Sequence, residues 1–200
     1  MKKENRFQLM LMLVISMILF YSCFNKGQSK SNKSPISLDS SKNDVKKITD
    51  YQFLDKYSIK VVPHLDTTNF DNFKLRDSLS NEKIKLLQLD KIASGDIINF
   101  WLNYRLSLAS DYKTLVVSYM PDENELYTIL INYNKDNNII DFDTVAYDEI
   151  AESCMRTESV IKNDSIEVIK INYCSEDSGK PMKKTLIYTI ASNGEIKASH

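Results

Sequence analysis

Glycine, histidine and cysteine are all scarce in this chain, which has four, two and three of them among its 200 residues. Few glycines alongside many Ile, Tyr, Val and Thr residues favour strands joined by Asn, Asp and Ser turns. His64 and His200 show no zinc-ligand spacing, and no Ser/His/Asp set has local support. The sequence therefore predicts no metal site, no cofactor and no catalytic residue.

The chain also lacks an excess of positive charge, with 26 Lys and Arg residues against 27 Asp and Glu and a formal net charge of −1. Removing residues 1–22, which carry Lys2, Lys3, Arg6 and Glu4, would change that net charge to −3. A mildly acidic chain has no electrostatic footprint for nucleic acid, so we expect no nucleic-acid partner.

No apolar run is long enough to cross a bilayer. The longest, from Leu9 to Phe20, would span only ~18 Å as a helix, against a hydrocarbon core of ~30 Å. It follows a positively charged start and precedes Ser22, a small residue. A charged start, a short apolar segment and a small residue before the cut are typical of a secretory signal.

The residues Leu19-Phe20-Tyr21-Ser22-Cys23 resemble the lipobox of bacterial lipoproteins, in a relaxed form with a bulky residue three positions before the cysteine. The resemblance implies that the signal (1–22) is removed and that Cys23 is lipidated. Acyl chains at ~0.8 kcal/mol per buried CH₂ would then anchor the protein to a membrane. An uncleaved signal anchor, or a nearby cut that leaves Cys23 unmodified, remains the alternative.

The stretches LINYNKDNNIIDFDTVAYDEIAES (130–153) and YTIASNGEIK (188–197) resemble short uncharacterised lipoproteins of Bacteroidota. This similarity covers roughly residues 80–198 and implies a fold type and a compartment, but no activity. No aspartate and no acidic run stands directly after Cys23. In the lipoproteins that the chain resembles, such residues direct retention in the inner membrane or export to the surface. Their absence at this position therefore favours a cell-envelope location on the outer membrane, facing the periplasm.

Residues 23–47 are expected to form the lipidated N-terminus and a flexible tether. From Lys26 to Lys47 the chain is almost free of apolar residues and cannot offset the entropy of ordering. A tether of this length has a root-mean-square reach of ~25 Å. Residues 48–200 then remain as one β-rich domain, long enough to bury a core.

The strongest pattern in this domain is a period of two. From Ile98 to Leu108 the even-numbered residues are apolar, which predicts a half-buried strand. Further strands are expected near 112–120, 125–133, 139–147, 153–162, 165–174, 184–191 and 195–199. Their short connections allow only antiparallel neighbours. The predicted fold class is α+β, mainly β: an up-and-down meander of seven or eight strands, as a curved sheet or partly open barrel, with one packed helix at 80–93.

Once Cys23 is set aside, Cys154 and Cys174 remain as a pair in an oxidising compartment, where a cross-strand disulfide is expected. A register that places Cys154 opposite Cys174 also places Glu158 opposite Lys170, and such pairs contribute ~0.2–1 kcal/mol each. The sequence therefore predicts that register. Two free packed thiols are the alternative.

Four further residues are candidates for binding. Trp101 and Arg105 lie on the polar side of the first strand, where an exposed indole would suit a partner, although a covered Trp101 would belong to the core. Asp141 and Asp143 share one face of a strand, so their spacing would allow acid/base chemistry, although such carboxylates usually belong to a solvated face. Asn134 and its neighbours resemble the start of a calcium loop but lack its glycine and glutamate.

The sequence does not identify an activity. The favoured interpretation is a non-enzymatic, lipid-anchored envelope protein that binds a protein partner. A carrier of a small ligand or lipid is the alternative if the meander encloses a cavity of ~300 Å³ or more. An envelope hydrolase using acidic residues is the third.

Overall fold

The computed structural model describes residues 51–93, 99–174 and 180–199. The predicted signal (1–22), the lipidation site Cys23 and the tether (23–47) lie outside these residues. The described residues belong to one compact unit. Among the described residues, no helix has the length and hydropathy needed to cross a membrane.

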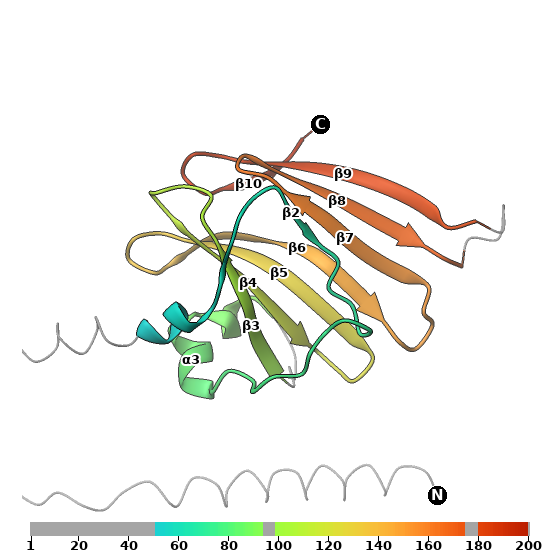
Figure 1. Cartoon of the computed structure of the whole chain (residues 1–200), viewed down its shortest axis with the longest axis horizontal. Helices are drawn as coiled ribbons and strands as arrows, with labels where there is room; N and C mark the ends of the chain where they lie inside the picture. The colour runs from blue at the N-terminus through green and yellow to red at the C-terminus, as the bar shows by residue number, and fades with distance from the viewer. Residues whose placement is uncertain (1–50, 94–98, 175–179, 200) are drawn as a thin grey trace, which may run out of the picture. The chain divides into compact units, whose positions relative to one another are not determined.

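Ten strands form one mostly antiparallel sheet that is not closed (Figure 1), in the order β1-β3-β4-β5-β6-β7-β8-β9-β10, with β2 beside β7. The strands are β1 (Ile59–Lys60), β2 (His64–Asp66), β3 (Asn99–Leu106), β4 (Lys113–Met120), β5 (Glu125–Tyr133), β6 (Ile139–Glu149), β7 (Met155–Ile161), β8 (Ser165–Asn172), β9 (Met182–Ile190) and β10 (Ile196–Ala198). The predicted meander is confirmed as β3 to β10, and it is an open sheet.

The two strands that sequence reasoning missed form a strap, residues 59–66, across the opening of the sheet. Ile59 in β1 pairs in parallel with Arg105 in β3. His64 in β2 pairs antiparallel with Ile161 in β7. The strap therefore joins the first strand of the meander to its second half.

The predicted helix at 80–93 is real but broken. It consists of α3 (Asn81–Leu86) and a 3₁₀ turn, η2 (Leu89–Lys91), and a second 3₁₀ turn, η1 (Gln52–Lys56), precedes the strap. Gln88 has a left-handed backbone with φ of 56°, which a continuous helix cannot contain. The break lets Leu87 and Leu89, on either side of it, both be buried.

A β-bulge in β3 interrupts the predicted alternation. The register with β4 shifts between Leu102 and Tyr104. Phe100 and Leu102 therefore pack in the core beneath the helices. Tyr104 and Leu106 pack in a second core. An extra residue in one strand moves the following side chains to the other face of the sheet, which the pattern of even-numbered apolar residues does not reveal.

The second core lies between the two halves of the folded sheet. It joins residues from β3–β5 to residues from β6–β10, and Val116, Leu130, Val145, Ile161 and Ile166 are fully buried in it. These side chains fill the space that a barrel would offer to a ligand. The carrier alternative depends on a meander that encloses a cavity, whereas the described strands form a sheet that is not closed.

The predicted register of the hairpin β7–β8 is wrong by one residue. The ladder pairs Thr157 with Lys170 and Ile161 with Ile166. Both isoleucines are fully buried, and a shift by one would place Ile161 opposite the partly exposed Glu167. Burial of two large aliphatic side chains, at about 1.5–3 kcal/mol each, outweighs one exposed Glu–Lys pair.

The two cysteines nevertheless meet, because they lie just beyond the last pair of that ladder. The backbone N–H of Tyr173 donates to the carbonyl of Cys154 at 2.7 Å. The Cα atoms of Cys154 and Cys174 are 5.1 Å apart, and their sulfur atoms are at bonding distance. The pairing agrees with the prediction, although the cysteines do not face each other in the ladder.

Candidate functional site

Trp101 belongs to the core. Only 5% of its surface is exposed. Its Nε1–H donates to the carbonyl of Arg76 at 2.9 Å, and the ring of Phe73 meets it edge-on with centroids 5.3 Å apart. The indole therefore anchors the loop before α3 and offers no free surface to a partner.

Arg105 attaches the start of the domain to β3. Its Nε donates to the carbonyl of Tyr57 at 3.1 Å, and its Nη1 lies 3.1 Å from the Asp55 carboxylate. Its backbone N–H donates to the carbonyl of Ser58. These contacts hold η1 and β1 against the sheet, so the guanidinium has a structural task.

Asp141 and Asp143 do lie on the same face of β6, opposite Asn132 and Leu130 of β5. One oxygen of the Asp141 carboxylate accepts from the backbone N–H of Phe142, and the other accepts from the backbone N–H of Ile196. It therefore fastens β10 to β6. Burial raises the pKa of Asp143, an effect that Asp141 adds to, while the Thr144 N–H and Lys170 oppose it.

The stretch that resembles the start of a calcium loop is an ordinary hairpin turn. The side-chain oxygen of Asn134 accepts from the backbone N–H groups of Asp136 and Asn138, at 2.9 and 3.0 Å. Asn132 is fully buried and points away from that turn, to the carbonyl of Gly194. These oxygens do not converge on one point.

The feature that sequence reasoning missed is a row of tyrosines across three strands. The tyrosine row consists of Tyr119 on β4, Tyr127 on β5 and Tyr147 on β6. Tyr119 and Tyr127 stack with centroids 5.2 Å apart, and Tyr127 and Tyr147 follow at 4.8 Å. All three side chains are partly exposed. Cross-strand aromatic pairs of this kind stabilise the sheet and leave an apolar surface.

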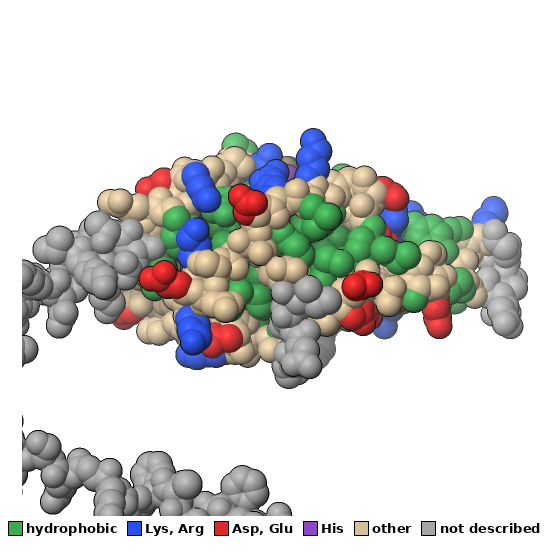
Figure 2. All heavy atoms as spheres, turned by 90° about the horizontal axis from the view of Figure 1, so that it is seen from below, with side chains coloured by type: hydrophobic (Ala, Val, Ile, Leu, Met, Phe, Trp, Pro, Cys, Tyr) green, Lys and Arg blue, Asp and Glu red, His purple; other side chains and the backbone are tan. Residues whose placement is uncertain are grey.

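The row lies on the side of the sheet that carries α3, because Tyr119 and Ile84 of α3 pack on the same core. On this side the molecule shows gathered hydrophobic side chains with acidic ones beside them (Figure 2). The helices cover the start of the sheet and leave the row partly open. The row is thus a surface feature.

Two carboxylates border the row. The Tyr147 hydroxyl lies 2.9 Å from the Glu125 carboxylate and 2.8 Å from that of Glu149. Burial and these two hydrogen-bonded carboxylates raise the pKa of Tyr147. Burial raises the pKa of Tyr119 and Tyr127 as well, and Glu125 adds to both shifts. The row therefore stays uncharged and carries acceptor oxygens at its edge.

Beside Tyr127 and Tyr147 the surface is hollowed into a groove of about 310 Å³ between β6 and the strands β7–β9. The groove is lined by Tyr127, Asp143, Thr144, Tyr147, Met155, Thr157, Val168, Lys170 and Tyr188. Asp143 is thus the one sequence-predicted binding residue that lies in this groove. Aromatic faces next to one carboxylate and one ammonium suit a ligand with apolar and polar parts.

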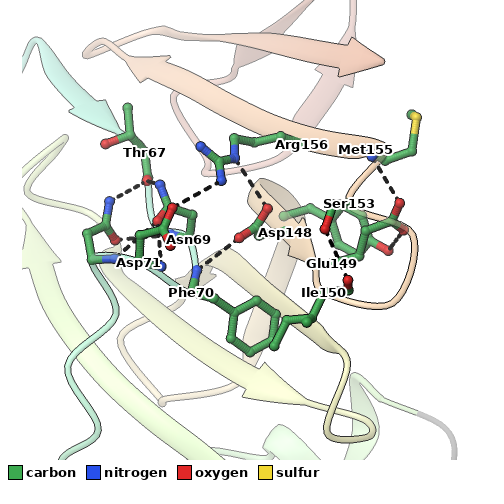
Figure 3. A network of polar contacts seen from close by, with 12 residues as sticks. Thr67, Asn69, Phe70, Asp71, Asp148, Glu149, Ile150, Ser153, Met155 and Arg156 are labelled. Carbon is green, nitrogen blue, oxygen red and sulfur yellow. Dashed lines mark hydrogen bonds and ion pairs between the residues drawn. The ribbon is translucent and has the colours of Figure 1, made fainter. Parts of the chain in front are cut away.

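A polar network holds the end of β6 beside this groove (Figure 3). The buried Asp148 accepts from the backbone N–H of Phe70 at 2.9 Å and pairs with Arg156 at 3.2 Å. Glu149 accepts from the backbone N–H groups of Cys154 and Met155. Asp148 and Glu149 therefore hold the neighbouring loops in place through internal contacts.

Glu149, Glu152 and Cys154 lie close enough together to hold a metal ion. The Cys154 sulfur, however, lies at bonding distance from Cys174. A sulfur in a disulfide is not a thiolate and is a poor ligand. Of the two carboxylates, that of Glu149 already accepts from the backbone N–H groups of Cys154 and Met155, and Glu152 is exposed.

His64 lies against Tyr104, with the two rings edge-on and 4.8 Å apart. Burial lowers its pKa from the usual 6.5; Asp66 opposes this shift and Lys60 adds to it. The unfolded chain therefore binds the proton more readily. The stability that neutral His64 contributes is present above pH 6.5 and is lost as the pH falls below it.

His64→Phe keeps the ring contact and removes the titration. We expect the urea midpoint of the native chain to fall more between pH 7.5 and 5.5 than that of the variant. Equal falls in the two proteins would show that His64 does not contribute to this pH dependence.

No family model, curated protein or solved structure matches the chain.

Proposed function

We propose that the chain is a lipid-anchored envelope protein without catalytic activity, which binds a protein partner through the tyrosine row. The signal-like segment, Ser22-Cys23 and the polar stretch that follows support the anchor. The observation that supports the binding role is the partly exposed, uncharged row of Tyr119, Tyr127 and Tyr147. Rigid aromatic side chains are the ones most enriched at protein interfaces and their hot spots.

The acidic border indicates the chemistry of the partner. Glu125 and Glu149 adjoin the row. Two more acidic residues, Asp122 and Glu123, lie in the turn before β5. An arginine or lysine can lie over a tyrosine face and meet these carboxylates at the same time. We therefore expect the partner to present an apolar segment that contains a basic residue.

The hydrolase hypothesis has less support. Both carboxylate oxygens of Asp141 accept from backbone N–H groups. Asp143, beside it, lies in the groove with Lys170 and three tyrosines. A carboxylate committed to two backbone bonds is poorly placed to move protons to and from a substrate.

A photo-crosslinking amino acid in place of Tyr127 tests the proposal in intact cells of the native host. We expect a discrete protein adduct from this position, and none from the same amino acid at Lys183, which is exposed on β9. Glu125→Lys, introduced beside the Tyr127 crosslinker, should abolish the adduct by reversing the border charge. Asp136→Lys, an equal charge change in the exposed β5–β6 turn, should preserve it.

Two results would contradict the proposal: no adduct from position 127, or the same adducts from positions 127 and 183. An adduct that survives Glu125→Lys would contradict only the basic character assigned to the partner.

A further inference from the structure

A second hollow, of about 710 Å³, lies over β3 at the bulge, apart from the tyrosine row. One wall is the segment 56–60 at the start of the strap, and the other is the loop 68–77. We call it the basic hollow, because four cationic side chains line it: Lys56, Lys60, Lys74 and Arg76. All four residues are exposed.

The charge of this hollow is not balanced locally. Asp77 is the one acidic side chain in its lining. In the part of the chain that the structure describes, none of the four cations has a carboxylate within ion-pair distance. Elsewhere, Arg105 and Lys135 each have one, and Arg156 has two. Four like charges around one hollow, in a chain of net charge −1, create a local positive potential that favours an anion.

The backbone that carries Lys74 and Arg76 is held in place. Trp101 donates to the carbonyl of Arg76, and Phe73 packs edge-on against the same indole. The base of the loop is fixed by Asn69, whose side-chain oxygen accepts from the N–H groups of Asp71 and Asn72. The buried Trp101 therefore positions this wall of the hollow, which reduces the cost of ordering it around a ligand.

Ser58 and Thr68, which both carry hydroxyl groups, also line the hollow. Ammonium, guanidinium and hydroxyl groups are all donors to phosphate oxygens. A phosphate monoester carries about −1.5 to −2 charges near pH 7 and offers three acceptor oxygens, so it can engage several of these donors together. We propose that the basic hollow binds phosphate groups, carried either by a soluble molecule or by lipid headgroups.

The test uses the full chain with Cys23→Ser, which removes the predicted lipidation site and any acyl chain on it. The probes are inorganic pyrophosphate, titrated by calorimetry, and vesicles with or without phosphatidylglycerol in phosphatidylcholine. The loop variant Lys74→Ala/Arg76→Ala removes two cations from the hollow. The control variant Lys183→Ala/Lys184→Ala removes two exposed cations from β9.

We expect the loop variant to bind at least one probe about tenfold or more weakly than the native chain, because two charge-assisted contacts are lost. The control variant should bind as the native chain does. Loss of pyrophosphate binding alone would assign a soluble phosphorylated ligand. Loss of binding to the phosphatidylglycerol vesicles would assign lipid headgroups.

The proposal is overturned if the native chain binds neither probe, or if the loop and control variants bind each probe equally well. If the loop variant unfolds at a lower temperature than the native chain, Lys56→Ala/Lys60→Ala on the opposite wall replaces it. That variant should give the same selective loss.

Discussion

Asn132→Leu is expected to lower the free energy of unfolding by about 3 kcal/mol or more, because it leaves two buried polar groups without partners. Asn132 is fully buried. Its oxygen accepts from the Thr114 hydroxyl at 2.7 Å, and its side-chain N–H₂ donates to the Gly194 carbonyl at 2.8 Å. The second bond joins β5 to the turn between β9 and β10, so its loss also loosens the end of the sheet.

Urea denaturation of the variant and of the native chain measures this effect. Asn163→Leu, at an exposed position in the β7–β8 turn, is the matched control and should cost much less. Adding Thr114→Val to Asn132→Leu removes one unsatisfied hydroxyl and should restore part of the lost stability. A loss below about 1 kcal/mol, the value of an ordinary hydrogen bond, would contradict the assigned role of Asn132.

Removing the Cys154–Cys174 pair is expected to cost about 3 kcal/mol, since it frees a loop of about 20 residues in the unfolded chain. The separation of the two cysteines is 20 residues. Cys154→Ser, Cys174→Ser and the double variant should lose the same stability, because each removes the same bond. Denaturation midpoints of the three variants and the native chain measure this loss.

The mass of the intact protein, alkylated with and without reductant, tests the bond itself. We expect two additional alkyl groups only after reduction. Equal alkylation in both samples would show two free thiols and would exclude the disulfide. Unequal losses of stability in the two single variants would point to separate packing roles for the two sulfur atoms.

The parts of the fold that local patterns encode could be predicted from the sequence. Period-two alternation and Asn/Asp turns located the strands β3 to β10, and a short apolar stripe located α3. The strap could not be found in this way, because β1 and β2 have two and three residues and pair with distant strands. The bulge in β3 could not be predicted for a different reason. Tyr104 is apolar enough to fit on either face of the strand, so the sequence pattern does not show that its side chain changes face.

The candidate site depends on contacts between strands, and so less of it was predictable. Trp101, Arg105 and Asp141 were selected for their residue types, and all three turned out to hold the fold together. The tyrosine row does have a sequence signal: the turns at 121–124 and 134–138 align Tyr119, Tyr127 and Tyr147 once the hairpin registers are known. The hairpin β7–β8 shows how easily a register is misjudged by one residue.

The strap also has a consequence for how the domain assembles and opens. Each strand from β3 to β10 pairs with its neighbour in sequence, so those pairings close short loops. His64 pairs instead with Ile161, far along the chain, and contacts of that kind form late. We therefore expect the strap to form after the meander and to detach before it. In the anchored protein that we propose, a force transmitted through residues 23–47 would act first on η1 and the strap, which are the described elements nearest to the tether in sequence.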